Sequence, residues 1–340
     1  MATAGTGAKP NGRLHVGTSA GNAGLAGRLG SRGSRTLGWS AALVATALTL
    51  AVGFFGIYRY LGNFWLYRGY PPPRDPAWVK QRGTVQNIAV TSPAIGGRSQ
   101  QVIVFLPPGY AAHPHRRYPV FYLLHGSPGL PNALLLTVKA GVVEDELVAS
   151  HQIRPMILVM PFGSSGRFTD TEWANGVRGD SGWETFLARD VVRTIDARYR
   201  TIRSGAGRAL AGLSEGGYGS LNIGLHHPGE FRVLESWSGY ERADKILSIF
   251  GRSKERLAYN SPHSYLPSVA RRLRKRGTYV WFYSSHGDRF LGQNSSFAHE
   301  LARLRIRHSF TVVSGGHNWR AWRENFPQAI RAASGRLSGG

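Results

Sequence analysis

The sequence Gly-Leu-Ser-Glu-Gly occupies positions 212–216, with Ser214 at its centre. It fits the pattern G-x-S-x-G, in which glycines flank the serine because a tight turn from a strand into a helix holds it in a strained backbone conformation. The preceding residues 208–212 are strand-like, and residues 215–225 can open a helix whose glycines allow close packing on a sheet. The pattern therefore favours Ser214 as a nucleophile over a serine in an ordinary glycine turn.

A serine hydroxyl needs a base that takes its proton and an acid that orients the base. Of the 12 histidines, His317 is the best placed, because it lies in a glycine loop directly after the last predicted strand. Loops at the carboxyl ends of strands form the site in open α/β sheets. The alternative for His317 is a turn histidine on the surface. His226 and His227 are expected to cap a helix end, and His113 and His115 to be solvated in a basic loop.

The orienting acid should fall between the serine and the histidine in chain order. Asp288 follows the predicted strand Tyr279–Tyr283 and so reaches the same edge of the sheet. Its alternative role is a loop carboxylate paired with Arg289. Glu241, after the preceding strand, is the reserve candidate. The other carboxylates in this interval are Glu230, Glu235, Asp244, Glu255 and Glu300.

Negative charge that develops on a substrate carbonyl needs preorganised hydrogen-bond donors. One predicted donor is the backbone N–H of Glu215, directly after the nucleophile. The other is expected in the loop after an early strand, as the N–H of Ser127, because Gly126 and Gly129 would let that backbone approach a substrate closely. Pro128 has no N–H and cannot serve. This chemistry requires no metal or organic cofactor.

Elements that could position these residues alternate along the chain from about residue 83 to 336. A leading antiparallel pair is followed by short apolar runs typical of buried parallel strands, with helical patterns between several of them. Such alternation predicts an α/β fold whose mostly parallel sheet is covered by helices on both faces. The predicted strands are Thr84–Val90, Gln101–Leu106, Val120–Leu124, Met156–Met160, Ala209–Leu213, Val233–Trp237, Tyr279–Tyr283 and Phe310–Val313, and the predicted helices include Trp183–Tyr199, Glu215–His226 and Ser295–Arg305.

The composition excludes several classes of protein. The chain has 340 residues, of which 42% are hydrophobic, so it can bury a core and is not disordered as a whole. It has no cysteine, which excludes a disulfide framework, an iron–sulfur cluster, a cysteine nucleophile and a thiolate zinc site. Its 42 Lys and Arg against 19 Asp and Glu leave a net charge of +23, which would attract anionic lipid, wall polymer or nucleic acid.

The N-terminal part divides into three segments. Residues 1–36 are rich in small residues, carry only basic charges and predict a disordered tail. Residues 37–57 carry no charge and are just long enough, at about 1.5 Å per residue, to cross a hydrocarbon core of roughly 30 Å. They predict a retained transmembrane anchor, the alternative being a cleaved signal peptide. Residues 58–82 read as a juxtamembrane linker with a Pro-rich spacer, and residues 83–336 as the α/β domain.

Similar numbers of arginines lie close to the apolar segment on each side, so the distribution of positive charge alone does not set its orientation in the membrane. A short tail before a single span most often stays inside, while a long following domain is translocated. We therefore expect a single-pass protein of the cell membrane with its α/β domain outside.

Five motifs in order resemble the putative-esterase family of α/β-hydrolases, which includes esterase D, feruloyl and enterochelin esterases and the antigen 85 mycolyltransferases. The resemblance spans roughly residues 85–335 and implies the α/β-hydrolase fold, Ser214 as nucleophile, His317 as base and backbone donors at Ser127 and Glu215. It supports Asp288 less firmly, because the acid varies in the family. Antigen 85 proteins carry Asp where His125 stands, so mycolyl transfer is one possibility among several. The motifs are Leu-Leu-His-Gly from residue 123, Met-Pro-Phe-Gly from 160, Trp-Glu-Thr-Phe-Leu from 183, Gly-Leu-Ser-Glu-Gly-Gly from 212 and Gly-His-Asn-Trp-Arg-Ala-Trp from 316.

The expected function is an ester hydrolase or acyltransferase whose substrate is linked to lipid or cell wall, such as an aminoacylated phospholipid or a glycolipid. The alternative is a catalytically silent fold that binds anionic lipid or polymer. Basic clusters at residues 252–256, 271–276 and 303–307 lack the base-stacking aromatic residues or recognised module that nucleic-acid binding needs, so no nucleic-acid partner is expected. Residues 241–276 could form a cap that selects the substrate.

Overall fold

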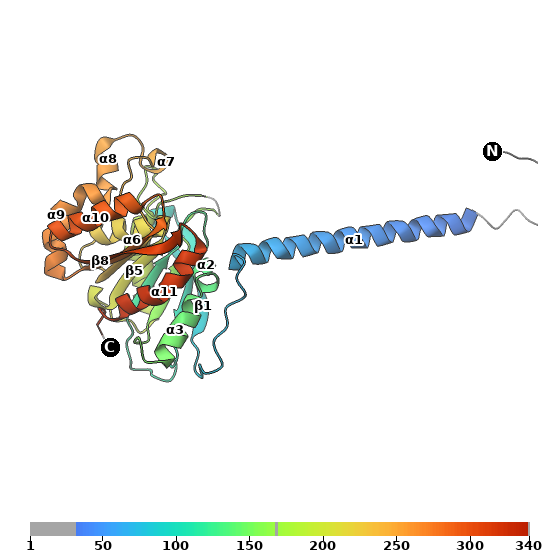
Figure 1. Ribbon diagram of the computed structural model, residues 1–340, viewed down its shortest axis with the longest axis horizontal. Helices are drawn as coiled ribbons and strands as arrows, with labels where there is room; N and C mark the ends of the chain where they lie inside the picture. The colour runs from blue at the N-terminus through green and yellow to red at the C-terminus, as the bar shows by residue number, and fades with distance from the viewer. Residues whose placement is uncertain (1–31, 167–168, 339–340) are drawn as a thin grey trace, which may run out of the picture. The chain divides into compact units, whose positions relative to one another are not determined.

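Eight strands form one sheet, in the order β1-β2-β4-β3-β5-β6-β7-β8, within the residues that the structure describes (Figure 1). The computed structural model describes residues 32–166 and 169–338. β1 pairs antiparallel with β2, and β2 with β4, whereas every later pair is parallel. The predicted antiparallel pair followed by parallel strands is confirmed. The strands are β1 (Thr84–Ser92), β2 (Arg98–Leu106), β3 (Val120–Leu124), β4 (Ile157–Pro161), β5 (Arg208–Leu213), β6 (Val233–Trp237), β7 (Tyr279–Gly287) and β8 (Arg307–Gly316).

The central strands are buried on both faces. Every residue of β3, β4, β5 and β6 is buried, which is why these segments read as continuous apolar runs. Successive side chains point to opposite faces of a strand. In β3, Tyr122 therefore packs into one core, while Phe121 and Leu123 pack into the other.

Helices cover both faces of the sheet. One core contains buried residues of α4, α6, α9 and α10, and the other contains buried residues of α2, α3 and α11. The predicted three-layer α/β arrangement is thus present. The helices of this domain are α2 (Pro131–Leu136), α3 (Ala140–Ala149), α4 (Trp183–Thr185), α5 (Val192–Arg198), α6 (Glu215–His226), α7 (Leu247–Phe250), α8 (Lys254–Tyr259), α9 (Pro262–Arg276), α10 (Leu291–Arg303) and α11 (Trp319–Ser334), with 3₁₀ turns η1 (Pro93–Ile95) and η3 (Gly205–Gly207).

Some helices differ from their prediction. The predicted helix Trp183–Tyr199 is a continuous helical run, but its middle, η2 (Phe186–Val191), is π-helical. The helix predicted over Ser295–Arg305 runs from Leu291 to Arg303. α9 and α11 were not among the predicted helices, and each contains a proline that reads as a helix breaker in sequence, Pro267 and Pro327 respectively.

Contacts divide the chain into two units, residues 1–60 and 61–340. The described part of the first unit belongs to α1 (Arg32–Tyr67), which continues into the second. Its segment Trp39–Tyr67 has 29 residues and a mean hydropathy of 2.0, so by length and composition it could cross a membrane. The helix runs beyond the predicted anchor at both ends, because the following residues up to Tyr67 are rich in aromatic and apolar side chains and contain no proline. The start of the predicted linker is therefore helical, and most of the predicted tail lies outside the described residues.

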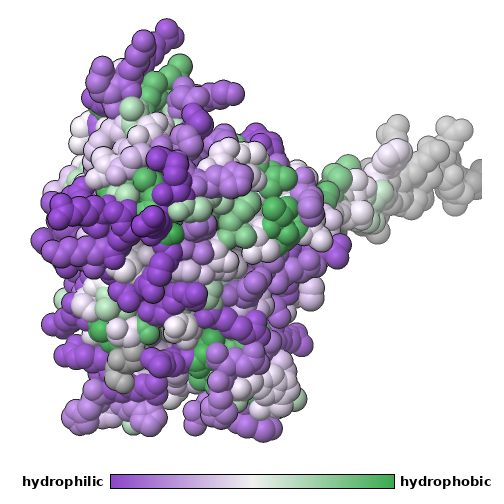
Figure 2. All heavy atoms as spheres, turned by 60° about the vertical axis from the view of Figure 1, so that its left-hand side comes forward, coloured by the Kyte–Doolittle hydropathy of each residue, from purple (hydrophilic) through white to green (hydrophobic). Residues whose placement is uncertain are grey.

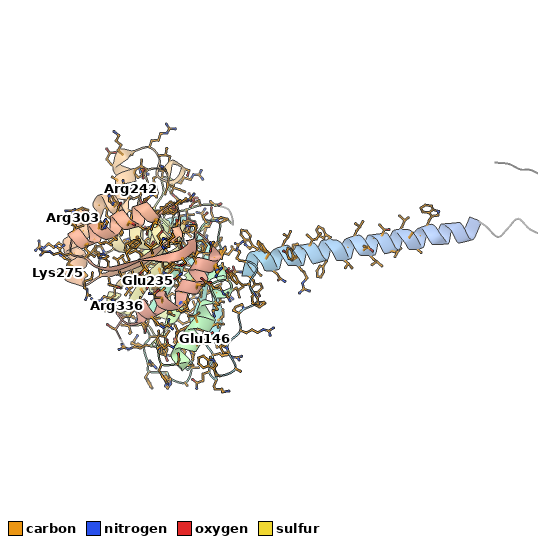
Figure 3. The ribbon with its side chains drawn as sticks, in the orientation of Figure 1. Glu146, Glu235, Arg242, Lys275, Arg303 and Arg336 are labelled. Carbon is orange, nitrogen blue, oxygen red and sulfur yellow. The ribbon has the colours of Figure 1, made fainter. Side chains whose placement is uncertain are left out.

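Basic side chains gather at the ends of α9 and α10. The face in Figure 2 is covered largely by hydrophilic residues, and Lys275 and Arg303 point away from the sheet at one edge of the domain in Figure 3. Some of these cations have structural partners: Arg274 Nη1 donates to the carbonyl of Leu304 at 2.7 Å, and Arg307 Nη2 donates to the carbonyl of Gly277 at 2.9 Å. Some of the arginines therefore hold the loops that follow α9 and α10 through hydrogen bonds to backbone carbonyl groups.

Candidate active site

Ser214 occupies the sharp turn between β5 and α6. Its φ of 55° and ψ of −119° lie in a backbone region that residues other than glycine rarely adopt. The flanking glycines allow this turn, because a Cβ on Gly212 would lie 2.3 Å from the backbone of Gly216 and a Cβ on Gly216 would lie 2.3 Å from the carbonyl oxygen of Leu124. The turn holds the hydroxyl beyond the carboxyl end of β5, as the G-x-S-x-G pattern predicts.

His317 and Asp288 approach Ser214 from the carboxyl ends of β8 and β7. The Nε2 of His317 lies 2.8 Å from the Oγ of Ser214, and its Nδ1 lies 3.2 Å from Oδ2 of Asp288. His317 follows β8 and Asp288 follows β7, so three segments far apart in sequence meet at one edge of the sheet. With Nδ1–H donated to the carboxylate, Nε2 is free to accept the serine proton.

The Asp288 carboxylate is held in its ionised form. Burial by itself would raise its pKa, but hydrogen bonds from His317 and from the backbone N–H of Phe290 outweigh burial, and the pKa of Asp288 is lowered. The imidazole of His317 is also fixed by aromatic neighbours, because the rings of Trp322 and Phe290 pack edge-on to it at centroid distances of 5.1 and 5.7 Å. The base is therefore oriented on three sides.

Glu241, the reserve acid, has a different environment. Its side chain is buried, and neither carboxylate oxygen has a hydrogen-bond partner among the described residues. Burial and the nearby charge of Asp288 raise its pKa, which Arg242 only partly offsets, so Glu241 is stabilised in the neutral form. The structure places Asp288, and not Glu241, against His317.

The two residues whose backbone N–H groups are predicted to bind an oxyanion both line the cavity beside Ser214. Glu215 is the first residue of α6, Ser127 lies in the loop after β3, and both line this cavity. No hydrogen bond from either backbone N–H is found within the described part of the chain. Both N–H groups are therefore available to a substrate oxygen.

His125 supports the loop that carries Ser127. The backbone N–H of Gly163 donates to its Nε2 at 3.1 Å, so the proton resides on Nδ1, which donates to the carbonyl of Gly126 at 2.9 Å. Burial lowers the pKa of His125 to about 4, which keeps the ring neutral and this tautomer in place. From the sequence, His125 stood out only as a departure from antigen 85, and this supporting role was not predicted.

Two cavities flank Ser214. The larger has a volume of about 710 Å³ and is bordered by charged side chains, including Asp170, Arg242, Lys245 and Arg289. The smaller has a volume of about 240 Å³ and is bordered mainly by apolar and aromatic side chains. Residues 240–246, which follow β6, supply much of the wall of the larger cavity. A cap formed by residues 241–276 that selects the substrate stays a prediction.

A carboxyl group lies directly beside the nucleophile. Glu215 accepts the backbone N–H of Glu172 at 2.8 Å, and Tyr240 donates its hydroxyl to Glu172. Burial raises the pKa of Glu215 well above its usual range, and burial with the charge of Asp170 raises the pKa of Glu172 to about 8. These groups join the loop before Trp173 to α6, and nothing in the local sequence pattern signals this contact.

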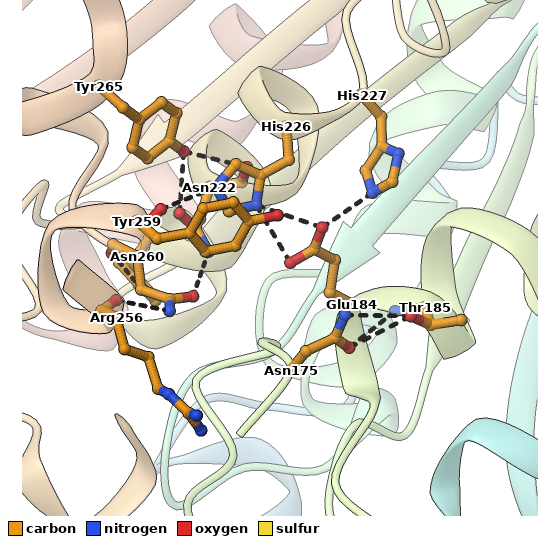
Figure 4. A network of polar contacts seen from close by, with 11 residues as sticks. Asn175, Glu184, Thr185, Asn222, His226, His227, Arg256, Tyr259, Asn260 and Tyr265 are labelled. Carbon is orange, nitrogen blue, oxygen red and sulfur yellow. Dashed lines mark hydrogen bonds and ion pairs between the residues drawn. The ribbon is translucent and has the colours of Figure 1, made fainter. Parts of the chain in front are cut away.

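The remaining histidines lie outside this arrangement. His227 is the C-cap residue of α6, as predicted, but its side chain and that of His226 both bind the buried carboxylate of Glu184 (Figure 4). His226 also contacts the carbonyl of Tyr259 through Nε2 at 2.8 Å. Capping alone was therefore an incomplete prediction, because Glu184 is distant in sequence and meets α6 only in the folded chain. His113 and His115 are exposed.

The parallel sheet, the serine turn and the adjoining histidine and aspartate define an α/β-hydrolase. Residues 92–333 match the family model described as "Putative esterase", and the chain belongs to that family. The family resemblance deduced from the motifs is thus confirmed.

Relatives and solved structures agree with this assignment. The chain is 32% identical over 212 residues to an endo-1,4-beta-xylanase/feruloyl esterase of Xylanibacter ruminicola (56% of this chain, 28% of that one) and 27% identical over 252 residues to esterase Rv1288 of Mycobacterium tuberculosis (66% and 54%). It thus spans about half or less of these relatives' lengths. A solved ferulic acid esterase superposes with a TM-score of 0.67 at 25% identity, covering 75% of this chain and 100% of its own.

Proposed function

We propose that this chain is a serine-dependent ester hydrolase or acyltransferase that acts through an acyl-enzyme. The observation that carries the proposal is the contact of 2.8 Å between His317 Nε2 and Ser214 Oγ, with Asp288 on the opposite ring nitrogen. A serine turn without a base would leave the hydroxyl unactivated. Membership of an esterase family supports the same chemistry.

In the proposed first half-reaction, Ser214 Oγ attacks the ester carbonyl while its proton passes to Nε2 of His317. The negative charge on the former carbonyl oxygen is stabilised by the N–H groups of Ser127 and Glu215, and the charge of the imidazolium by Asp288. The tetrahedral intermediate then collapses: the bond to the leaving alcohol breaks, and the alcohol takes the proton from His317. Ser214 is left as an acyl ester.

In the second half-reaction a water molecule or an alcohol gives a proton to His317 and attacks the acyl carbonyl. Ser214 leaves with the proton that His317 returns to it. Water yields hydrolysis and an alcohol yields acyl transfer. Transition-state stabilisation by such donors typically contributes about 3 to 4 kcal/mol per donor removed.

We further propose that the substrate is a lipid- or wall-linked ester outside the cell membrane. The apolar segment of α1 supports retention at a membrane, and the exposed basic residues at the end of α9 would favour an anionic surface. The long domain after a single span supports the outward orientation. Aminoacylated phospholipids and glycolipids belong to this substrate class.

The test of the mechanism is labelling by a fluorophosphonate together with ester turnover. We expect the parent protein to be labelled on Ser214, and Ser214→Ala to lose the label and to slow turnover by about a thousandfold or more. Ser296→Ala, which removes an exposed serine hydroxyl from α10, is the matched control and should behave as the parent. An unlabelled parent protein, or equal turnover by parent and Ser214→Ala, would refute the proposal.

A further inference from the structure

The C-terminal end of α1 packs against the hydrolase domain. The described residues from Trp39 to Phe64 are exposed, but Trp65, Tyr67 and Arg68 are half-buried. The hydroxyl of Thr137 donates to the carbonyl of Leu66 at 2.7 Å, and so binds one of the carbonyl groups that a helix end leaves without a partner in the helix. All these contacts lie within the unit 61–340.

A row of aromatic side chains connects this helix end with the catalytic histidine. The guanidinium of Arg68 lies 3.8 Å from the ring centroid of Trp65 and 5.2 Å from that of Trp319. Trp319 packs edge-on to Trp322 at 5.1 Å, and Trp322 packs against His317 at the same distance. Helix α1 is thus linked to the site by four consecutive ring contacts.

The smaller cavity beside Ser214 is bordered by this row. Trp65 and Arg68 from the helix end, Trp319 and Trp322 from α11, and Leu213 and Pro128 from the serine turn and its facing loop surround it. Its wall is mainly apolar, whereas the larger cavity on the other side of Ser214 is bordered by several charged groups. An ester bound at Ser214 would extend into both.

We propose that the smaller cavity binds the apolar acyl chain of a membrane lipid ester, and that Trp65 is a specificity-determining residue for that chain. The inference rests on the proposed esterase function. An apolar chain in the larger cavity would desolvate charged side chains without replacing their hydrogen bonds, which is costly. In the smaller cavity the apolar chain is buried against aromatic rings, which is favourable because its apolar surface leaves water. The polar alcohol part of the ester then occupies the larger, charged cavity.

The length of α1 favours a substrate that resides in a membrane. Its apolar segment has 29 residues, whereas about 20 residues cross a hydrocarbon core. With the hydrocarbon crossed by the predicted anchor, residues 37–57, Trp65 lies past its end, at the level where tryptophan side chains are enriched. An acyl ester at this level would reach Ser214 through the smaller cavity, which both Trp65 and Ser214 line.

The experiment compares the hydrolysis of p-nitrophenyl octanoate and p-nitrophenyl acetate by the full-length protein in detergent. We expect Trp65→Ala to lower kcat/KM for octanoate by about tenfold or more while that for acetate stays within about twofold, because only the longer chain fills the cavity. Trp319→Ala should show the same selectivity loss from the α11 side. Trp65→Phe should retain most of the parental selectivity, and Trp78→Ala, which removes an exposed tryptophan elsewhere in the domain, should leave it unchanged.

Fluorophosphonate labelling of Ser214 confirms that each variant is folded. Unchanged selectivity in the labelled Trp65→Ala and Trp319→Ala proteins would overturn the assignment of the cavity and leave the esterase function standing. A parent protein that hydrolyses neither ester would overturn the esterase function, and this inference with it.

Discussion

Ser214 depends on neighbours that tolerate its unusual backbone geometry and remove its proton. Its positive φ costs conformational energy that the surrounding packing must offset, and such strain is typical of residues that act in a site. In the proposed mechanism His317 is the base and Asp288 orients it, while His125 braces the loop that carries Ser127. The proposed chemistry of one hydroxyl thus depends on side chains from three separate loops.

The two carboxylates near His317 are predicted to differ in their contribution to turnover. Asp288→Asn should lower kcat by about 10³ to 10⁴, because the amide favours the wrong imidazole tautomer and cannot stabilise the imidazolium. Glu241→Gln should leave kcat within a few-fold of the parent, since neither carboxylate oxygen of Glu241 has a hydrogen-bond partner among the described residues and the group is already stabilised in the neutral form. Ester turnover by the two variants measures the difference, and a larger loss for Glu241→Gln would contradict the assignment of Asp288.

At the scale of elements, a buried polar network joins α4 to the end of α6. Burial alone would raise the pKa of Glu184, but hydrogen bonds from His226 and His227 outweigh it and hold that pKa below its ordinary value. The hydrogen bond to Glu184 raises the pKa of His227 despite partial burial. Tyr265 also bonds Asn222 of α6, so α9 is joined to the same region (Figure 4).

These shifts predict a pH-dependent stability. The contribution of His227 is fully present below its unfolded pKa, about 6.5, and is lost as pH rises through its raised folded pKa. The contribution of Glu184 is fully present above its unfolded pKa, about 4.3, and is lost as pH falls through its lowered folded pKa. The pair should therefore stabilise the fold most between about pH 4.3 and 6.5.

Thermal melting of the His227→Gln variant tests whether the pair of His227 and Glu184 stabilises the fold in a pH-dependent way. We expect its Tm to lie below the parental Tm by a few °C at pH 6, and by less at pH 9, where the parent has lost the ion pair. His115→Gln, at an exposed position, should match the parent at both pH values. A deficit of equal size at pH 6 and pH 9 would show that the interaction is not ionic.

At the scale of the whole molecule, the apolar helix should hold the chain at a membrane. We expect the parent protein to remain with membranes after carbonate extraction and to have the mass of the uncut chain. Two arginines in place of Val44 and Leu48, both exposed on α1, should release it, because each costs about 2.5 to 3.5 kcal/mol near the bilayer centre. The control Val177→Arg, on the domain surface, should stay bound. A soluble or shortened parent protein would contradict a retained anchor.

Much of this arrangement could be predicted from local sequence. The strands β3 to β6 are buried on both faces and therefore appear as short apolar runs, and the turn around Ser214 requires glycines at fixed positions. Loops at the carboxyl ends of parallel strands meet at one edge of the sheet, so His317 and Asp288 were candidates before any coordinate was known. The helices with internal prolines, α9 and α11, were missed because a proline in sequence reads as a helix breaker, while their apolar faces are buried only in the folded chain.

The sequence by itself determined the α/β class, the nucleophile turn and the apolar N-terminal segment, because each depends on residues that are neighbours along the chain. Only the tertiary structure showed that Asp288 contacts His317, that Glu184 binds His226 and His227, and that Trp65 and Trp319 line the same cavity. These pairings depend on which side chains of distant segments meet across the folded sheet and its loops. Their partners are separated by dozens to hundreds of residues, so no local periodicity or spacing records them.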